Sequence, residues 1–346
     1  MKVVAKKLAL ILSLCCLPLL LLVLLEGGFR GLKALQSWGG FLQEMPLDSH
    51  AVSPVREGSQ DYVLRVKRLK GEKVLWDVEY LMKAGMDHRL FFVNQDPNRA
   101  KHLNLLGGSY TFGVNLEDDD TLAGFFRRKF GEEFFINNFG IPGAGPSEML
   151  EFLDRYDHLI KRTGPGVSYY FFIDDHIPRA LMDLQHVADW NKEPYYIPNR
   201  KGDVSYAGPF YSAKPFLNGL LNVADSFQLL RKLGFNPPFG KIKNINQAHK
   251  NHVCSLMAGI KRRVLRSFPS TEFKVVFLPK EGLSHFLLAD CLKRKNISIV
   301  DLSSLINLRS LEDPSKWSEF YFSDFHPRGK YNEVVVEALA ELPPFK

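Results

Sequence analysis

Cysteine is scarce in this chain, with four residues among 346. Cys15 and Cys16 lie inside an apolar N-terminal stretch, which leaves Cys254 and Cys291 for the rest of the protein. Neither of these two has a metal-binding neighbour at a useful spacing, so the sequence argues against a structural zinc site. The pair can form one disulfide or none, and the sequence leaves both open. No motif indicates a metal or another cofactor.

Charge of one sign is not concentrated anywhere in the chain. Lysine and arginine number 45 against 38 acidic residues, for a net charge of +7, but the basic residues are dispersed. The densest basic run, Lys261-Arg262-Arg263 with Arg266, is typical of the solvated face of a helix. This pattern argues against a nucleic-acid partner. The chain also has no internal repeat and no low-complexity tract, and its 45% hydrophobic residues indicate a globular protein with a sizeable core.

One long apolar run stands at the N-terminus. It extends without a charge from Leu8 to Leu25, and three lysines precede it. Such a run is about long enough to cross a bilayer, and the positive flank favours a cytoplasmic N-terminus. No small-residue cleavage site follows it, so we expect an uncleaved anchor over residues 1–26 rather than a signal peptide. The remainder would then lie outside the cytoplasm, in the periplasm or the extracellular space.

The rest of the chain divides into three parts by composition and rhythm. Residues 27–60 are typical of a juxtamembrane linker, and the alternating pattern in residues 61–99 predicts a β-ribbon. Residues 100–346 form the main domain. Within it, residues 185–251 are rich in aromatics, proline, glycine and asparagine, with one amphipathic helix expected at 223–233. This insertion is either a cap over a site, where its aromatic rings could stack on sugars, or a structural excursion along the sheet edge.

Outside the insertion, the main domain alternates short apolar runs with amphipathic segments. The predicted strands are Leu103–Leu106, Glu133–Asn137, Val167–Ile173, Phe273–Leu278 and Ile297–Leu302. The predicted helices are Thr121–Phe130, Ser147–Lys161, Ala248–Phe268, Ser284–Arg294 and Gly329–Leu342. An alternation of this kind predicts an α/β fold with a mostly parallel sheet and helices on both faces.

The stretch Gly-Gly-Ser-Tyr-Thr-Phe-Gly at residues 107–113 follows the first of these strands. Its glycines allow the backbone to turn sharply, so we expect the hydroxyl of Ser109 to be exposed at the turn, as a nucleophile needs. Near the C-terminus, Asp324 and His326 stand two residues apart in Ser-Asp-Phe-His-Pro. Serine, histidine and aspartate in this combination indicate acyl transfer.

Two further polar segments follow predicted strands. The strand ending near Asn137 continues into a loop that contains Gly140, and the strand Val167–Ile173 continues into Asp174, Asp175 and His176. The carboxyl ends of parallel strands meet at one edge of a sheet, where ligands bind. We therefore expect these groups to converge with Ser109.

These four segments, in this order, resemble the SGNH/GDSL hydrolase superfamily, and in particular its membrane-anchored, envelope-facing members. Residues 107–113 are similar to the family's Gly-Asp-Ser block, with Ser109 as nucleophile, and Gly140 matches the glycine whose N–H helps to bind the oxyanion. Asp324 and His326 match the last block. The resemblance implies a flavodoxin-like, three-layer α/β/α fold. It also implies hydrolysis or transfer of an ester-linked acyl group, often acetyl on a carbohydrate.

Two positions depart from the family pattern. Gly108 stands where the family has an aspartate, and Asp175 (or Asp174, one residue earlier) stands where it has an oxyanion-binding asparagine. An ionised carboxylate only accepts hydrogen bonds and would repel an oxyanion. Either one aspartate stays protonated, or His176 supplies the donor, or the activity is weak, changed or lost. A purely structural role is equally open, for instance an ion pair between Asp175 and Arg179.

The sequence therefore predicts a membrane-anchored serine esterase or O-acyltransferase acting on an acylated glycan or another ester. In this interpretation His326 is the general base, Asp324 orients it, and the N–H groups of Ser109 and Gly140 bind the oxyanion, with Asp174 or Asp175 beside them. The alternative is a degenerate domain that binds a polysaccharide or an assembly partner without catalysis. A third possibility is a mainly structural envelope protein, which only the anchor and the insertion favour. Taken alone, the last motif also allows a structural role, in which Asp324 caps the final helix and His326 packs on it.

Overall fold

The computed structural model describes residues 50–52, 62–70, 73–83, 88–89, 100–182, 192–199, 203–219, 245–278, 284–302, 305 and 314–346. The expected anchor over residues 1–26 and the expected helix at 223–233 lie outside these ranges. Within them, no helix is both long and apolar enough to cross a membrane. The chain divides into two units, residues 1–48 with 214–241 and residues 49–213 with 242–346. The fold and the site described below belong to the second unit.

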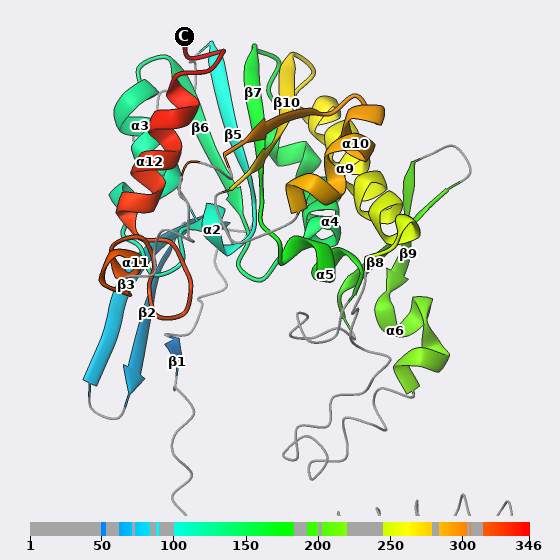
Figure 1. Ribbon diagram of the computed structural model, residues 1–346, viewed down its shortest axis with the longest axis horizontal. Helices are drawn as coiled ribbons and strands as arrows, with labels where there is room; N and C mark the ends of the chain where they lie inside the picture. The colour runs from blue at the N-terminus through cyan, green and yellow to red at the C-terminus, as the bar shows by residue number, and fades with distance from the viewer. Residues whose placement is uncertain are drawn as a thin grey trace, which may run out of the picture. The chain divides into compact units, whose positions relative to one another are not determined.

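A five-stranded parallel sheet forms the centre of this unit (Figure 1). Its strands are β5 (Lys101–Gly107), β6 (Phe134–Gly140), β7 (Gly166–Phe172), β10 (Thr271–Phe277) and β11 (Ser298–Asp301). They lie in the order β11-β10-β7-β5-β6, and every neighbouring pair is parallel. This is the flavodoxin-like order, in which the next strand along the chain, β6, lies on one side of β5 and the later strands lie on the other. The predicted α/β fold with a mostly parallel sheet is confirmed.

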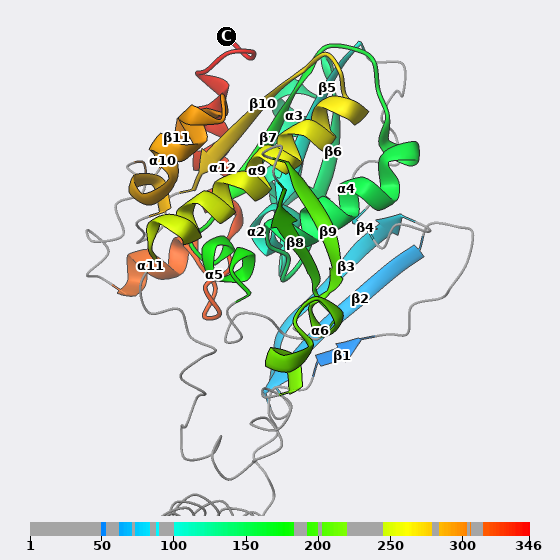
Figure 2. The same ribbon diagram turned by 90° about the vertical axis from the view of Figure 1, so that its right-hand side faces the viewer.

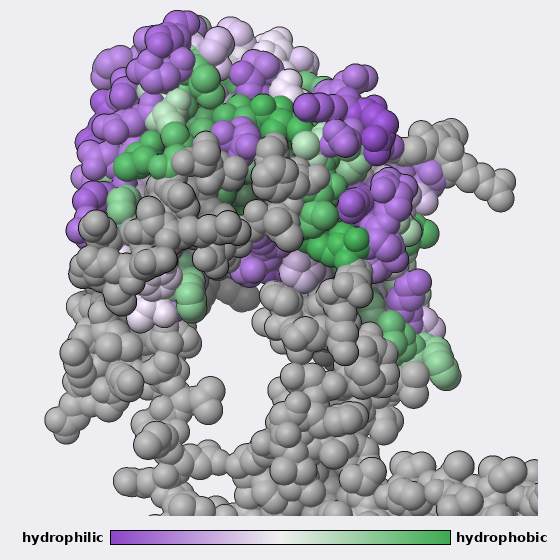
Figure 3. All heavy atoms as spheres, in the orientation of Figure 1, coloured by the Kyte–Doolittle hydropathy of each residue, from purple (hydrophilic) through white to green (hydrophobic). Residues whose placement is uncertain are grey.

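Helices cover both faces of the sheet, because its strands are apolar on both sides. The helices are α3 (Leu122–Phe130) and α12 (Gly329–Ala340) on one face, and α4 (Pro146–Ile160), α9 (Gln247–Ser267) and α10 (Ser284–Arg294) on the other. Each face has its own buried core. Figure 3 shows apolar residues that run across the visible face of the described part of the chain, with polar residues on both sides of them.

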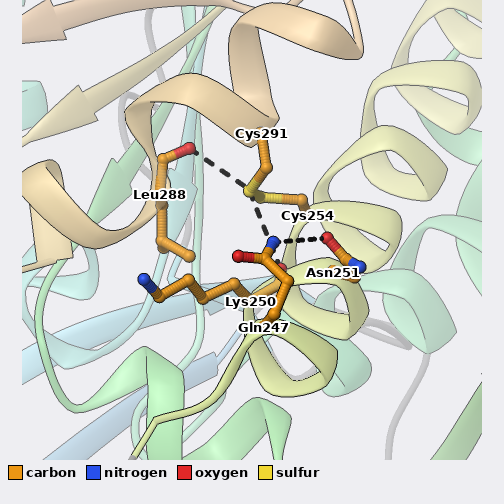
Figure 4. Close-up of a disulfide and its surroundings, with 6 residues drawn as sticks. All are labelled: Gln247, Lys250, Asn251, Cys254, Leu288 and Cys291. Carbon is orange, nitrogen blue, oxygen red and sulfur yellow. Dashed lines mark hydrogen bonds between the residues drawn. A yellow bond between two sulfur atoms is a disulfide. The ribbon is translucent and has the colours of Figure 1, made fainter.

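The two cysteines of the main domain form a disulfide between α9 and α10. The Cα atoms of Cys254 and Cys291 are 6.1 Å apart, and Gln247, Lys250 and Asn251 line the bond on the α9 side (Figure 4). The bridge closes a loop with a sequence separation of 37 residues. A loop of that length corresponds to a stabilisation of about 3–4 kcal/mol by the chain-entropy account.

The unit also contains two antiparallel sheets, one before the central sheet in the sequence and one between β7 and β10. The first contains β1 (His50–Val52), β2 (Tyr62–Lys70), β3 (Lys73–Lys83) and β4 (His88–Arg89), so a hairpin forms where the ribbon was expected.

The second antiparallel sheet is a hairpin within the insertion. It comprises β8 (Pro194–Pro198) and β9 (Val204–Pro209), followed by α6 (Phe210–Ala213), and it contacts α4 and α9 (Figure 2). This hairpin was not predicted, because its strands are short and have prolines at their ends.

Candidate functional site

The C-terminal ends of β5, β6 and β7 lie side by side. In the sheet register Gly107 pairs with both Gly140 and Phe171, so these three strands end at the same edge. Because β5 lies between β6 and β7, the chain segments that leave the three strands surround one point, the switch point of the sheet. Ser109, the loop after Gly140 and the segment Asp174–His176 all belong to these segments.

Ser109 is the first residue of a short helix, α2 (Ser109–Phe112), which begins directly after β5. As the first helical residue it has a backbone N–H without a partner inside the helix. The expectation of an exposed serine was wrong, since Ser109 is only 7% exposed. The reason is that all four residues of α2 are buried against the sheet edge, whereas a free turn would leave the serine in solvent.

Asp324 and His326 lie in a tight loop after α11 (Pro314–Phe320), and their side chains are adjacent. The Nδ1 atom of His326 is 3.2 Å from Oδ2 of Asp324, and the backbone N–H of His326 also donates to Oδ1 of Asp324 at 3.3 Å. Asp324 does not cap the last helix, because Arg328 is the residue at that position. The carboxylate faces the imidazole, which is the arrangement of an orienting acid and a general base.

Tyr110 connects this loop to the serine turn. Its hydroxyl donates to the carbonyl oxygen of Phe325 at 2.6 Å, and its ring lies 6.1 Å from the His326 ring, centroid to centroid. Burial raises the pKa of Tyr110 far above its usual range, and the nearby charges of Tyr321, Asp175 and Asp324 raise it further. Tyr110 therefore stays a neutral hydrogen-bond donor. Since Tyr110 directly follows Ser109 and Phe325 directly precedes His326, this hydrogen bond ties the two segments together.

Sequence reasoning missed Asn115. Its side-chain amide donates to Oδ2 of Asp324 at 2.9 Å, and its backbone N–H donates to the hydroxyl of Tyr80 on β3 at 3.0 Å. Tyr80 itself packs edge-on against Phe112 of α2, with ring centroids 5.2 Å apart. Asn115 has a left-handed backbone with φ 68°, a conformation that asparagine tolerates better than most residues. An asparagine in a turn was the only local signal, and its partner lies 209 residues further along.

These contacts explain the charge of Asp324. Partial burial by itself would raise the pKa of its carboxyl, but His326 and Asn115 more than offset that effect and hold the pKa at about 2. The carboxylate is therefore ionised at neutral pH. It can stabilise a positive charge that develops on His326.

We expect the substitution Asn115→Gly to lower kcat by about tenfold with little change in KM, since it removes one hydrogen bond to a charged acceptor, worth roughly 1.5–3 kcal/mol. Glycine keeps the left-handed backbone available, so the loss is confined to the amide. The pKa of Asp324 should rise towards its usual value. Steady-state kinetics across pH and carboxyl titration by NMR measure both changes.

Asn296→Gly is the matched control for this experiment. Asn296 has a similar left-handed backbone, with φ 54°, in an exposed turn after α10. It should keep the activity of the unmodified protein. An Asn115→Gly protein with an unchanged kcat would contradict the positioning role of Asn115.

The segment Asp174–His176, which follows β7, leads into the short helix α5 (His176–Ala180). Asp175 directly precedes this helix, and its charge, like that of Asp324, raises the pKa of Tyr110. His176 is fully buried against Tyr170 and Phe172, and a hydrogen bond of 3.5 Å joins the Ile173 N–H to its Nδ1. Asp174 accepts the backbone N–H of Ile177 through its own carbonyl oxygen.

His176 also explains why Gly108 has no side chain. A Cβ atom at Gly108 would lie 2.9 Å from Nε2 of His176 and 3.6 Å from Nη1 of Arg179. The space that the family's aspartate would need is therefore filled by α5. The side chains that fill this space, His176 and Arg179, follow Asp174 and Asp175 in the chain.

Gly140 has a different role from the one expected of it. Its N–H donates to Oδ1 of Asn138 at 2.8 Å, so this donor is already engaged, and the Asn138 amide donates in turn to the carbonyl oxygen of Thr111 at 2.8 Å. A Cβ atom at Gly140 would lie 2.2 Å from the backbone nitrogen of Phe112. Glycine is required here because the backbone of α2 packs directly on it.

The loop after β6 closes in a tight turn that sequence reasoning did not specify. The N–H of Ala144 bonds to the carbonyl oxygen of Ile141 at 3.1 Å, which closes a turn with Pro142 and Gly143 in its centre. Gly143 is exposed with φ 77°, as a type II turn requires, and this turn does not use the Gly143 N–H. Arg179 supports the turn, since its Nη1 donates to the Ala144 carbonyl at 3.1 Å. The Pro-Gly pair was the available signal.

In the part of the chain that the structure describes, no group of three or more histidine, cysteine or acidic side chains is placed to hold a metal ion.

Comparison of the sequence with protein families and with curated proteins finds no match. Solved structures do resemble the fold. A member of the lipolytic G-D-S-L family from Veillonella parvula is 10% identical, with a TM-score of 0.39, and the match covers 70% of this chain and 98% of that one. The carbohydrate acetylesterase Est24 from Sinorhizobium meliloti is 9% identical, with a TM-score of 0.36 over 70% and 97% of the two chains.

The acetyl xylan esterase Est2A from Butyrivibrio proteoclasticus is also 9% identical, with a TM-score of 0.38 over 71% of this chain and 64% of its own. Likenesses at these scores are too loose to transfer a function.

Proposed function

We propose that this protein is a serine esterase or O-acyltransferase of the SGNH type. The observation that supports this most strongly is the pair of hydrogen bonds that join the serine turn to the acid–base loop. Tyr110 bonds to Phe325, and Asn115 bonds to Asp324. These bonds span 215 and 209 residues of sequence, respectively, and they link the segment that starts at Ser109 to the loop that contains Asp324 and His326.

The chemistry follows the usual order for a serine nucleophile. His326 takes the proton of the Ser109 hydroxyl as its oxygen attacks the ester carbonyl, and the ionised Asp324 stabilises the imidazolium. The tetrahedral intermediate collapses to an acyl-enzyme while His326 returns the proton to the departing alcohol. Water or an acceptor alcohol then attacks the acyl-enzyme by the reverse sequence, and Ser109 is released.

The oxyanion of the intermediate needs donors near Ser109. We propose the N–H of Ser109 and the N–H of Gly143, because the first has no partner inside α2 and the second is not used by its turn. Arg179 adds a positive charge beside Gly108, which offsets the carboxylates of Asp174 and Asp175. Each such donor is worth roughly 3–4 kcal/mol in well-studied cases.

The proposed substrate is an ester-linked acyl group on a glycan, the class that the resemblance to SGNH hydrolases implies. The proposed location is outside the cytoplasm, held by residues 1–26. The disulfide between Cys254 and Cys291 fits an oxidising compartment. Digestion of intact and of lysed spheroplasts with an external protease tests the location, and a domain that is digested only after lysis would contradict it.

Covalent labelling tests the assignment of the nucleophile. A fluorophosphonate should label the folded protein once, at Ser109, because such reagents react with serines activated by a neighbouring base. Peptide mass spectrometry identifies the labelled residue. The substitution His326→Asn should slow the labelling strongly, whereas Ser298→Ala, at an exposed position at the start of β11, should not. Labelling of another serine, or none in the folded protein, would contradict the proposal and favour a binding domain without catalysis.

A further inference from the structure

The turn at residues 141–144 lies against the two residues that precede Ser109. Its first N–H donates to the carbonyl oxygen of Gly107 at 3.0 Å. At its other end, the carbonyl oxygen of Ala144 would lie 3.2 Å from a Cβ atom at Gly108. The position of the proposed oxyanion donor in this turn, relative to the serine, therefore depends on what holds the far end of the turn.

Two side chains from different elements hold that end. Nη1 of Arg179, on α5, donates to the carbonyl oxygen of Ala144 at 3.1 Å. Oε2 of Glu148, in the first turn of α4, accepts the N–H of Gly145 at 2.7 Å. The packing is close, since a Cβ atom at Gly145 would lie 2.7 Å from Cβ of Arg179 and 3.3 Å from Oε2 of Glu148. The turn thus ends between a guanidinium and a carboxyl group.

Glu148 has a second partner, which belongs to the insertion. Its carboxyl group hydrogen-bonds with that of Glu193, the residue directly before β8. Two carboxyl groups can bond to each other only when one of them carries a proton, because an ionised carboxylate has no donor. Burial and the contact with Glu193 raise the pKa of Glu148 well above its usual range, and the N–H groups of Glu148 and Gly145 offset this only in part. A shared proton therefore joins the insertion to the residue that holds the turn.

Side chains of β7, α5 and α9 also pack on α4. Tyr170, on β7, is fully buried, and burial together with the charge of Glu148 raises its pKa far above its usual range, so it stays neutral. Arg179, on α5, provides a positive charge that acts on the same tyrosine. The charges of α9 lie further along α4 in ion pairs, Arg263 and Arg266 with Asp154 and Asp157. The charge next to Gly145 therefore depends on the two glutamates.

On the basis of the function proposed above, we infer that Glu148 is a positioning residue which, paired with Glu193, holds the turn that presents the Gly143 N–H to the oxyanion. A helix cap needs only an acceptor at Glu148, so the bond to Glu193 goes beyond capping. When the pair loses its proton, two like charges are in contact, and their repulsion separates the side chains. Glu148 then loses the partner that orients it, and the turn loosens.

The substitution Glu148→Ala tests the positioning role. We expect kcat for a small acetyl ester to fall about tenfold or more and KM to change less than twofold, because a displaced oxyanion donor weakens binding of the transition state rather than of the substrate. Glu148→Gln should retain most of the kcat, since its amide can accept the Gly145 N–H and donate to Glu193.

His249→Ala is the matched control for this substitution. His249 occupies the corresponding position in the capping box of α9, where its Nδ1 accepts the N–H of Asn246 at 3.4 Å. Loss of that bond should leave kcat unchanged. A Glu148→Ala protein with the same kcat as the His249→Ala protein would overturn the inference.

The pH profile distinguishes positioning from capping. In the unmodified protein, kcat should fall on the alkaline side as the glutamate pair loses its shared proton. Glutamine has no such proton, so the Glu148→Gln protein should keep its kcat through that range. Identical profiles for the two proteins would show that Glu148 is only a cap and would overturn the inference.

Hydrogen exchange separates this inference from the proposed function, because it requires no activity. In the full-length protein, the amides of residues 141–145 should exchange faster after Glu148→Ala than after Glu148→Gln or His249→Ala, as measured by mass spectrometry. Equal exchange in all three variants would overturn the role of Glu148. The expected exchange pattern in a protein that hydrolyses no ester would instead contradict the proposed function.

Discussion

The Ser109→Ala protein is expected to hydrolyse a small acetyl ester with a kcat/KM about 10⁴-fold or more below that of the unmodified protein. The alanine removes the oxygen that forms the acyl-enzyme, and loss of the nucleophile in a serine enzyme leaves only the catalysis that oxyanion donors and substrate binding provide. Hydrolysis of p-nitrophenyl acetate, corrected for the spontaneous reaction, measures the loss.

The same variant should remain folded. Gly108 is the N-cap residue of α2 and makes no side-chain cap hydrogen bond, and alanine is well accommodated at the first position of a helix. We expect its free energy of unfolding to change by less than about 1 kcal/mol. Ser298→Ala, at the opposite end of the sheet, serves as the control and should keep full activity. Equal rates for the Ser109→Ala and unmodified proteins would exclude a serine esterase with this nucleophile.

The second large effect is on stability. We expect Gly140→Ala to lower the free energy of unfolding by about 3 kcal/mol or more, because overpacking of this severity exceeds what small shifts absorb. The added Cβ would meet main-chain atoms, Phe112 N at 2.2 Å and the carbonyl carbon of Thr111 at 2.6 Å. Neither can rotate away, so α2 must move and take Ser109 with it. Urea unfolding followed by circular dichroism measures the loss, and activity should fall with it.

This substitution also separates two roles for Gly140. Alanine retains a backbone N–H, so a glycine that served only as an oxyanion donor would tolerate the change with its stability intact. Gly219→Ala is the matched control, since a Cβ atom there meets nothing within 4 Å. A Gly140→Ala protein as stable as the Gly219→Ala protein would contradict the packing role that we assign to this residue.

The sequence determined the architecture of the main domain almost completely. Short apolar runs placed the five strands, and amphipathic patterns of period 3.6 placed the flanking helices, within a few residues of their observed ends. The apolar run Tyr169–Ile173 indicates a strand that is buried on both faces, and the amphipathic pattern of Pro146–Ile160 indicates a helix that is buried on one face. Both signals are local, because they depend only on residues that are close together in the sequence. The order of the motifs along the chain also predicted which segments meet at the sheet edge.

Only the tertiary structure decided how the site is held. Asn115 and Tyr80 support Asp324 across more than two hundred residues of sequence, and no local pattern records such a contact. The burial of Ser109, the packing of α2 on Gly140 and the filling of the space at Gly108 by His176 follow from how separate elements approach one another. The left-handed backbone of Phe325 is set by the bridge that closes its loop. Periodicity in a sequence reports which face of an element is buried, whereas these features depend on distances between elements, which arise only when the chain has folded.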